Sequence, residues 1–297
     1  MLGQQLVNAA VLGSMYALIA VGFTLYFGVL NLINLAHGAV YMIGAFAALA
    51  ALRLGQNFGL PLPLLLALAT LAAMLIAGFL GVAIEKIAVK PLRRAPPLVF
   101  LITSIAVYLV LEEAVLLFYP DGGNPHVFPD PFGQRTFTIG DVIVGHVQVF
   151  LVSVAVLAIC ITHLIITRTD LGRAIRAVTA DAVGARMMGI DVDATVSRTF
   201  FIGSALAAFG GIMEGMNFGS VIFNMGFVAA VKGFTAAVIG GLGNVYGALA
   251  GGYLLGLLEV LITAYVPSGA AYKNIVTFAV LILCLVFRPS GLLSRRA

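Results

Sequence analysis

Long apolar runs recur along the whole chain, and they constrain its fold more than any other feature. A run of about 20 apolar residues is long enough to cross the roughly 30 Å hydrocarbon core of a bilayer as a helix. Only 9% of the residues are charged, whereas soluble proteins carry about 25%. So few charges cannot cover a water-facing surface. The sequence therefore predicts an all-α integral membrane protein, a polytopic bundle that forms one transmembrane domain over residues 1–297.

Nine runs have about the length of a membrane span. They cover residues 5–27, 31–52, 61–84, 98–118, 147–167, 199–219, 227–243, 246–266 and 272–287. The seventh and the last are short, so the prediction is about 8–10 spans. No Lys or Arg precedes Arg53, and a cleaved signal peptide needs a basic leader. The first run is therefore expected to be a retained span.

Positive charge is concentrated in three places between the predicted spans. The clusters are Lys86, Lys90, Arg93 and Arg94; Arg168, Arg173, Arg176, Arg186 and Arg198; and Arg288, Arg295 and Arg296. Cytoplasmic loops carry such an excess, so all three are predicted to lie inside. The N-terminus, the proline-containing loop 119–145, Lys232 and Lys273 are then predicted outside. Because the net charge of +4 follows membrane topology, no nucleic-acid partner is expected.

Glycines recur at four-residue spacing in two of the runs. Small residues at this spacing let transmembrane helices approach closely. We therefore predict packing faces at Gly211, Gly215, Gly219, Gly243, Gly247 and Gly251. The same faces could instead border a moving pathway, and spacing alone does not separate these two roles.

The stretch 168–198 is the one substantial polar segment on the predicted inner side. Its apolar residues fall on one stripe of a helix: Leu171, Ile175, Val178, Ala182 and Ala185. Thr169 or Asp170 can cap the start of this helix, and Gly189 can end it in the left-handed conformation. Asp191 or Asp193 can cap the span that follows.

This segment could lie on membrane lipid or bind a soluble protein. Its five arginines are accompanied by four aspartates, Asp170, Asp181, Asp191 and Asp193. A helix with so small a net charge is weakly attracted to anionic lipid. A cytoplasmic protein partner is therefore favoured.

Asn31, Asn34 and His37 occur three residues apart in an otherwise apolar stretch. Unpaired polar groups facing lipid would cost several kcal/mol each, so these side chains must face protein or water. Three interpretations remain open: hydrogen bonds between helices, a wet connection between two spans, or a helix break at Asn31, Asn34, His37 and Gly38 that lines a translocation pathway.

Four acidic residues lie within predicted spans: Glu112, Glu113, Glu214 and Glu259. An intramembrane carboxylate costs roughly 2.5–3.5 kcal/mol on insertion scales. Glu214 precedes Gly215 on a glycine-containing helix, so it is expected to face the bundle interior. Proton coupling by Glu214 is an alternative that a stand-alone transporter would require.

Two groups of residues resemble a known family. ADAVGARMMGID is similar to the coupling loop of ABC importer permeases. GFTLYFGVLNLINLAHGAVYMIGAF and GFTAAVIGGLGNVYGALAGGYLLGLLE resemble the branched-chain amino-acid permease family, in the subunit type with the Asn-Leu-Ala-His-Gly signature. The resemblance runs from Gly22 to Glu259. It implies the ABC importer permease fold, and it assigns ATPase coupling to the segment that holds Arg176, Asp181, Gly184 and Gly189.

The resemblance also implies partners and a location. They are a second homologous permease subunit, two cytoplasmic ATP-binding subunits and a periplasmic or extracellular substrate-binding protein, in the bacterial cytoplasmic (inner) membrane. Relatives with a similar pattern carry urea or short amides, so such a substrate is an alternative. A stand-alone proton-coupled transporter and a passive channel are alternatives of other classes.

Motor and enzyme motifs do not occur in the sequence. A P-loop would need GxxxxGK[ST] to bind nucleotide phosphates, and the chain has no Gly-Lys dipeptide. HExxH, GxSxG and paired cysteine ligands are also lacking. We therefore expect no enzyme activity, cofactor or metal, with energy supplied by a partner or an ion gradient.

Overall fold

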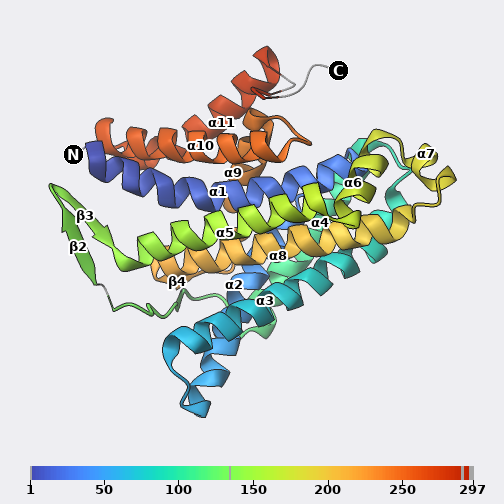
Figure 1. Cartoon of the computed structure of the whole chain (residues 1–297). Coiled ribbons are helices and arrows are strands. Elements are labelled where there is room, and N and C mark those ends of the chain that lie inside the picture. The colour runs from blue at the N-terminus through green and yellow to red at the C-terminus, as the bar shows by residue number, and fades with distance from the viewer. Residues whose placement is uncertain (1, 134, 289–290, 294–297) are drawn as a thin grey trace.

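The computed structural model describes residues 2–133, 135–288 and 291–293 and is a bundle of long helices (Figure 1). Its α-helices are α1 Leu2–Leu30, α2 His37–Gly55, α3 Leu62–Ile84, α4 Pro97–Phe118, α5 His146–Arg168, α6 Asp170–Ala180, α7 Ala182–Met187, α8 Val192–Phe218, α9 Met225–Gly240, α10 Val245–Tyr265 and α11 Gly269–Phe287. A π-turn (Glu85–Val89) and a 3₁₀ turn (Lys90–Leu92) extend α3, and another 3₁₀ turn (Gln56–Phe58) follows α2.

Eight of the described helices are long and apolar enough to cross a membrane, within the range predicted from the sequence. The seventh apolar run forms α9, which has 16 residues. At 1.5 Å per residue, α9 is about 24 Å long, which is shorter than the hydrocarbon core. Most of its residues are buried, so α9 lies inside the bundle.

Proline and glycine set several helix ends. Pro63 and Pro97 occupy the first turns of α3 and α4, where a missing backbone N–H costs nothing. Gly219 ends α8 with a φ of 70°, a conformation that favours glycine.

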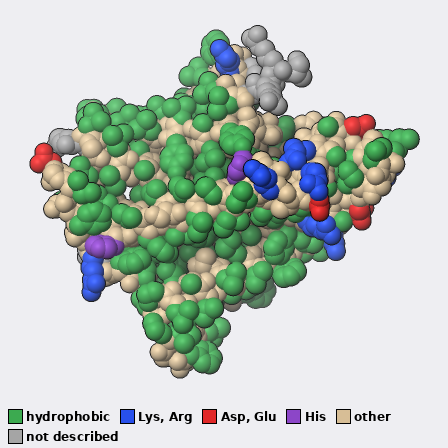
Figure 2. Space-filling view, viewed as in Figure 1, with side chains coloured by type: hydrophobic (Ala, Val, Ile, Leu, Met, Phe, Trp, Pro, Cys, Tyr) green, Lys and Arg blue, Asp and Glu red, His purple; other side chains and the backbone are tan. Residues whose placement is uncertain are grey.

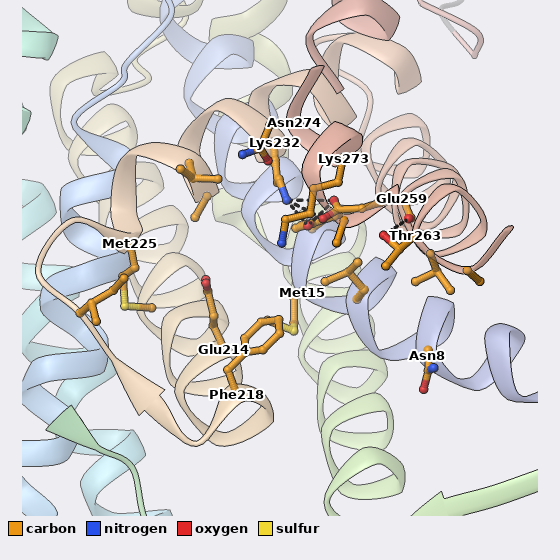
Figure 3. A pocket seen from close by; sticks show the side chains of 18 of the residues that line it. Asn8, Met15, Glu214, Phe218, Met225, Lys232, Glu259, Thr263, Lys273 and Asn274 are labelled. Atoms are coloured by element: carbon orange, nitrogen blue, oxygen red, sulfur yellow. Dashed lines mark hydrogen bonds and ion pairs between the residues drawn. The ribbon is translucent and has the colours of Figure 1, made fainter. Parts of the chain in front are cut away.

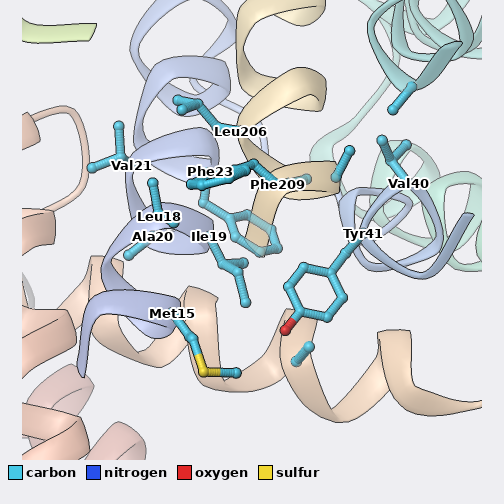
Figure 4. Packing of buried hydrophobic residues seen from close by; sticks show 14 of the residues in the cluster. Met15, Leu18, Ile19, Ala20, Val21, Phe23, Val40, Tyr41, Leu206 and Phe209 are labelled. Carbon is cyan, nitrogen blue, oxygen red and sulfur yellow. The ribbon is translucent and has the colours of Figure 1, made fainter. Parts of the chain in front are cut away.

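Helix α1 occupies the centre of the bundle and packs against α8, α9 and α10, while α2 and α3 pack against α8. Met15, Ile19 and Phe23 of α1 meet Tyr41 of α2 and Phe209 of α8 in this core (Figure 4).

The two ends of the bundle carry different connections. Near the N-terminus, Gln4 donates a 3.0 Å hydrogen bond to the carbonyl oxygen of Ile143. Ile143 belongs to a hairpin of β2 (Thr136–Ile139) and β3 (Val142–Gly145), paired antiparallel. A second short pair joins β1 (His126–Val127) to β4 (Ser220–Val221). The N-terminus thus lies beside loop 119–145, on the same side as predicted, and α6 and α7 lie at the opposite end (Figure 1).

The exposed surface matches a membrane environment. Figure 2 shows apolar side chains over most of the visible face, with Lys, Arg, Asp and Glu gathered near α6 and α7. At this end Arg93 pairs with the buried Glu85 and, at 2.6 Å, with Asp193. Of the third predicted basic cluster, Arg295 and Arg296 lie outside the described residues.

Candidate functional site: a charged cavity between helices

A cavity of about 750 Å³ opens between α1, α8, α9, α10 and α11. Its residues come from the first half of α1, the ends of α8 and α10, and the starts of α9 and α11. The cavity therefore lies toward the end of the bundle that holds the N-terminus and loop 119–145. We call it the outer cavity (Figure 3).

A buried ion pair forms one wall of the outer cavity. The Lys232 ammonium lies 2.7 and 2.9 Å from the two carboxylate oxygens of Glu259. Tyr16 donates a 2.6 Å hydrogen bond to that carboxylate, and Lys232 donates a 2.9 Å bond to the tyrosine oxygen. The side chains of Lys232 and Glu259 are 8% and 6% exposed. Burial on this scale is tolerated because each charge has an opposite partner and further hydrogen bonds.

Two further charged side chains reach the outer cavity from different helices. Glu214 of α8 accepts a hydrogen bond from the Tyr41 hydroxyl, and Lys273 of α11 also lines the cavity. Neither has an ion-pair partner within 4.0 Å among the described residues. Beside Lys273, the side-chain oxygen of Asn274 is buried without a hydrogen-bond partner in the described chain.

The rest of the outer cavity is largely apolar. Leu12, Met15, Met225, Val228 and Val260 are among its lining residues. The cavity therefore offers two signs of charge beside a surface that favours aliphatic groups.

A smaller cavity of about 210 Å³ lies toward the other end of α1. Thr24 and Gly28 of α1, Arg176 and Thr179 of α6, and Gly243 line it. We call it the inner cavity. Along α1 the outer cavity ends at Tyr16 and the inner one begins at Thr24, a separation of about 12 Å of helix.

Tight contact between α1 and α9 occurs at the level of α1 that separates the two cavities, at Ile19 and Phe23. A Cβ atom on Gly233 of α9 would lie 2.2 Å from Cγ2 of Ile19, closer than atoms can pack. One turn further along α1, Phe23 meets Phe234 edge to face with ring centroids 6.1 Å apart. The backbones of α1 and α9 approach this closely because Gly233 has no side chain.

The polar strip predicted at Asn31, Asn34 and His37 lies where α1 ends and α2 begins. Asn31 is exposed and has a φ of 53°. Asn34 is buried, and its side-chain oxygen accepts a hydrogen bond from the Ala36 backbone. The chain is thus unwound between the two helices, and residues 31–36 separate them.

His37 and Gly38 start α2 in the protein interior. The His37 ring packs edge to face against Phe23 and Tyr26, at centroid distances of 4.7 and 4.9 Å. A Cβ on Gly38 would lie 2.3 Å from the Gly226 carbonyl oxygen. None of these strip residues lines the outer cavity, and their proposed role in a pathway stays a prediction.

The sequence predicted one amphipathic helix after residue 168. The structure instead has two helices there, α6 and α7, so that prediction was wrong. Asp181 is extended, and its side chain accepts from the Val183 backbone N–H, which ends α6 and starts α7. The expected caps are confirmed: Thr169 accepts from Gly172, and Asp191 caps α8. Gly189 has the expected left-handed φ, 84°.

The four residues expected to couple to an ATPase fall at distinct places in this segment. Arg176 reaches the inner cavity and donates to the Ile166 carbonyl oxygen. Asp181 forms the α6–α7 junction, Gly184 lies within α7, and Gly189 turns the chain toward α8. Their proposed contact with a partner stays a prediction.

Four of the six predicted packing glycines make close contacts. A Cβ on Gly211 would lie 2.2 Å from the Tyr41 carbonyl oxygen, and one on Gly215 would lie 2.8 Å from Phe128. Gly247 and Gly251 of α10 approach the backbone of α9 in the same way.

The other two packing glycines need correction. Gly219 and Gly243 have φ of 70° and 86°, and a Cβ atom at either residue would have no neighbour within 4 Å among the described residues. They serve as turns after α8 and before α10. Repetition at four-residue spacing did not distinguish a helix face from the turn that ends the helix.

Lys232 lies toward the predicted outer end of the bundle. Its burial in α9 and its ion pair with Glu259 were not predicted. Both residues stood out as charges in apolar runs, and an intramembrane charge is expected to have a partner. The charge of Glu259 in an apolar run was therefore the signal in the sequence, because it indicated that a cationic partner lies nearby in the fold. Glu214 faces the interior, as expected.

Comparison with known proteins connects this architecture to a family. Residues 5–285 match the family model described as branched-chain amino acid transport system, permease component. The permease protein BraD of a high-affinity branched-chain amino acid transport system from Pseudomonas aeruginosa is 39% identical, over 98% of this chain and 95% of its own.

Two further relatives carry the name LivH. The high-affinity branched-chain amino acid permease LivH of Escherichia coli K12 is 37% identical with the same coverage. A probable branched-chain amino acid permease LivH of Methanocaldococcus jannaschii is 28% identical over 98% of this chain and 93% of its own. The chain is a multi-pass membrane protein that belongs to the permease family of branched-chain amino acid transport systems.

Proposed function

We propose that this chain is the transmembrane permease subunit of an ATP-driven importer for branched-chain or related amino acids in the bacterial cytoplasmic membrane. The observation that carries the proposal is similarity over almost the full length to relatives named for such transport. That similarity favours this function over a urea or amide permease and over a stand-alone secondary transporter.

The proposed translocation pathway runs from the outer to the inner cavity, with a second permease subunit completing it. An external binding protein delivers substrate to the outer cavity. On this proposal, the close contact between α1 and α9 at Ile19 and Gly233 is the closed point of the route between the two cavities. Transport then requires these helices to separate.

Two cytoplasmic ATPase subunits supply the work through α6 and α7. Support comes from the apolar tip of this segment, where Val183, Met187 and Met188 are 71%, 83% and 84% exposed. Exposed apolar side chains of this size mark interaction surfaces. Because α6 lines the inner cavity and packs against α1, a movement of α6 driven by the ATPases would be transmitted to α1.

Reconstitution tests the proposal. Proteoliposomes that hold the permease pair, its ATPases and its binding protein should accumulate radiolabelled leucine when ATP is supplied inside the ATPase-facing compartment. The chain reconstituted alone should accumulate none, with or without a pH gradient. Uphill uptake by the isolated chain would overturn the proposal.

A further inference from the structure

Glu214 and Lys273 stand apart from the other charges of the outer cavity. Lys232 and Glu259 neutralise each other and share the Tyr16 hydroxyl. Glu214 has one phenolic donor, Tyr41, and the Lys273 ammonium makes no hydrogen bond with any described residue. A carboxylate and an ammonium thus face one cavity from α8 and α11 without pairing (Figure 3).

The four charges sum to zero, which restricts the ligand that fits between them. An anion would leave Glu214 without a counter-charge, and a cation would do the same to Lys273. A molecule with both an ammonium and a carboxylate satisfies both groups, because each meets its opposite charge through charge-assisted hydrogen bonds.

We propose that Glu214 and Lys273 form a recognition site for a zwitterionic amino acid. The carboxylate of Glu214 binds the ligand's ammonium, and the ammonium of Lys273 binds the ligand's carboxylate. This inference rests on the proposed function and adds to it a binding site within the permease itself.

The apolar lining sets the side chain that the site accepts. Met15 and Met225 are flexible and fill irregular space, and Leu12, Val228 and Val260 add aliphatic surface. A third charge on the ligand would lie against this surface unpaired, at a cost of several kcal/mol. The site is therefore expected to favour neutral aliphatic amino acids over basic or acidic ones.

Ligand binding to the assembled permease–ATPase complex in lipid nanodiscs tests the site without the binding protein's own selectivity. The probe is radiolabelled L-leucine, displaced by 3-methylbutylamine, which lacks the carboxylate, or by 4-methylpentanoate, which lacks the ammonium. A charge-assisted hydrogen bond contributes about 1.5–3 kcal/mol, so Glu214→Gln and Lys273→Gln should each weaken leucine binding by at least about 10-fold.

The competitors separate recognition from a structural effect. In Lys273→Gln the preference for leucine over 3-methylbutylamine should disappear, while the preference over 4-methylpentanoate remains. Glu214→Gln should show the reverse, and Lys273→Arg should keep both preferences. Lys90→Gln, at the far end of the bundle, is the matched control and should bind as the wild type does.

Each outcome decides the inference. Unchanged leucine affinity in both Gln variants overturns it, and so does a loss of affinity that leaves both competitor preferences intact. If the wild-type complex accumulates leucine with its binding protein yet binds none without it, the site fails and the proposed function stands. If the complete system accumulates no branched-chain amino acid, the proposed function itself fails.

Discussion

The outer and inner cavities differ in both size and charge. The outer cavity is about 750 Å³ and contains Glu214, Lys232, Glu259 and Lys273, whereas the inner one is about 210 Å³ and holds the single charged residue Arg176. Of the two, the outer cavity alone has both signs of charge. The outer cavity is therefore suited to recognise a polar ligand, whereas the inner one adjoins the helix that is proposed to receive work from the ATPases.

The α1–α9 contact is apolar, unlike either cavity. It is formed by Ile19, Phe23, Gly233 and Phe234, and Gly233 lets the two helices touch. A zwitterion held in the outer cavity would have to cross this apolar layer. In the proposed function, recognition and energy input act on opposite sides of this apolar layer.

The largest effect is expected from breaking the buried pair in the outer cavity. Glu259→Gln leaves the Lys232 charge buried without its counter-ion, which costs about 3–5 kcal/mol. Thermal unfolding of the purified complex, followed by size-exclusion chromatography, should show a strongly lowered midpoint. The double variant Lys232→Met with Glu259→Met removes both charges, so its thermal midpoint should return most of the way to that of the wild type. An unchanged midpoint in the single variant would contradict the pairing.

A smaller effect is expected at the barrier. Gly233→Ala inserts a methyl group against Ile19 and costs about 1–3 kcal/mol by overpacking, so ATP-driven uptake should fall because α1 and α9 no longer close correctly. Gly145→Ala is the control away from both cavities, because its Cβ would lie 3.7 Å from Gln148, an ordinary contact. Equal uptake by the two variants would argue against a barrier at this position.

The inner side should respond to loss of the α6–α7 junction. Asp181→Ala removes the α7 cap, worth about 0.5–2 kcal/mol, and should uncouple ATP hydrolysis from uptake while the complex still assembles. Asp181→Asn keeps a capping side chain and should remain coupled, which separates the cap from the charge. The measurement is leucine accumulated per ATP hydrolysed. Full coupling in the Ala variant would remove the junction from the coupling route.

The smallest effect is expected for an exposed ion pair. Lys90 and Asp193 lie 2.8 Å apart, with side chains 51% and 44% exposed. Pairs of this kind contribute about 0–1 kcal/mol. Lys90→Gln should therefore leave the thermal midpoint almost unchanged, in contrast to Glu259→Gln. A similar drop in both variants would show that burial does not distinguish the two pairs.

Features set by local chemistry could be predicted from the sequence. Thr169, Gly189 and Asp191 have the expected caps and turn, because capping depends on residues only a few positions away. The apolar runs predicted the spans for the same reason. Glu214 was predicted to face the interior from the neighbouring Gly215, and there it accepts a hydrogen bond from Tyr41.

Features that depend on distant partners were missed. Lys232 and Glu259 are 27 positions apart, and nothing local indicates that α9 folds inside the bundle beside α10. Asp181 breaks a helix that periodicity alone continues, since its side chain caps the following turn instead. Residues of five helices line the outer cavity, so separate stretches of the sequence could not predict it.

Access to the two cavities tests most directly whether one closed barrier separates them. In a complex whose Cys160 and Cys284 are replaced by Ser, a membrane-impermeant maleimide applied from the N-terminal side should label Thr263→Cys, an exposed residue that lines the outer cavity. The same reagent should label Thr179→Cys in the inner cavity only when applied from the α6–α7 side. Equal labelling of Thr179→Cys from the N-terminal side in the resting complex would contradict a barrier at Ile19 and Gly233.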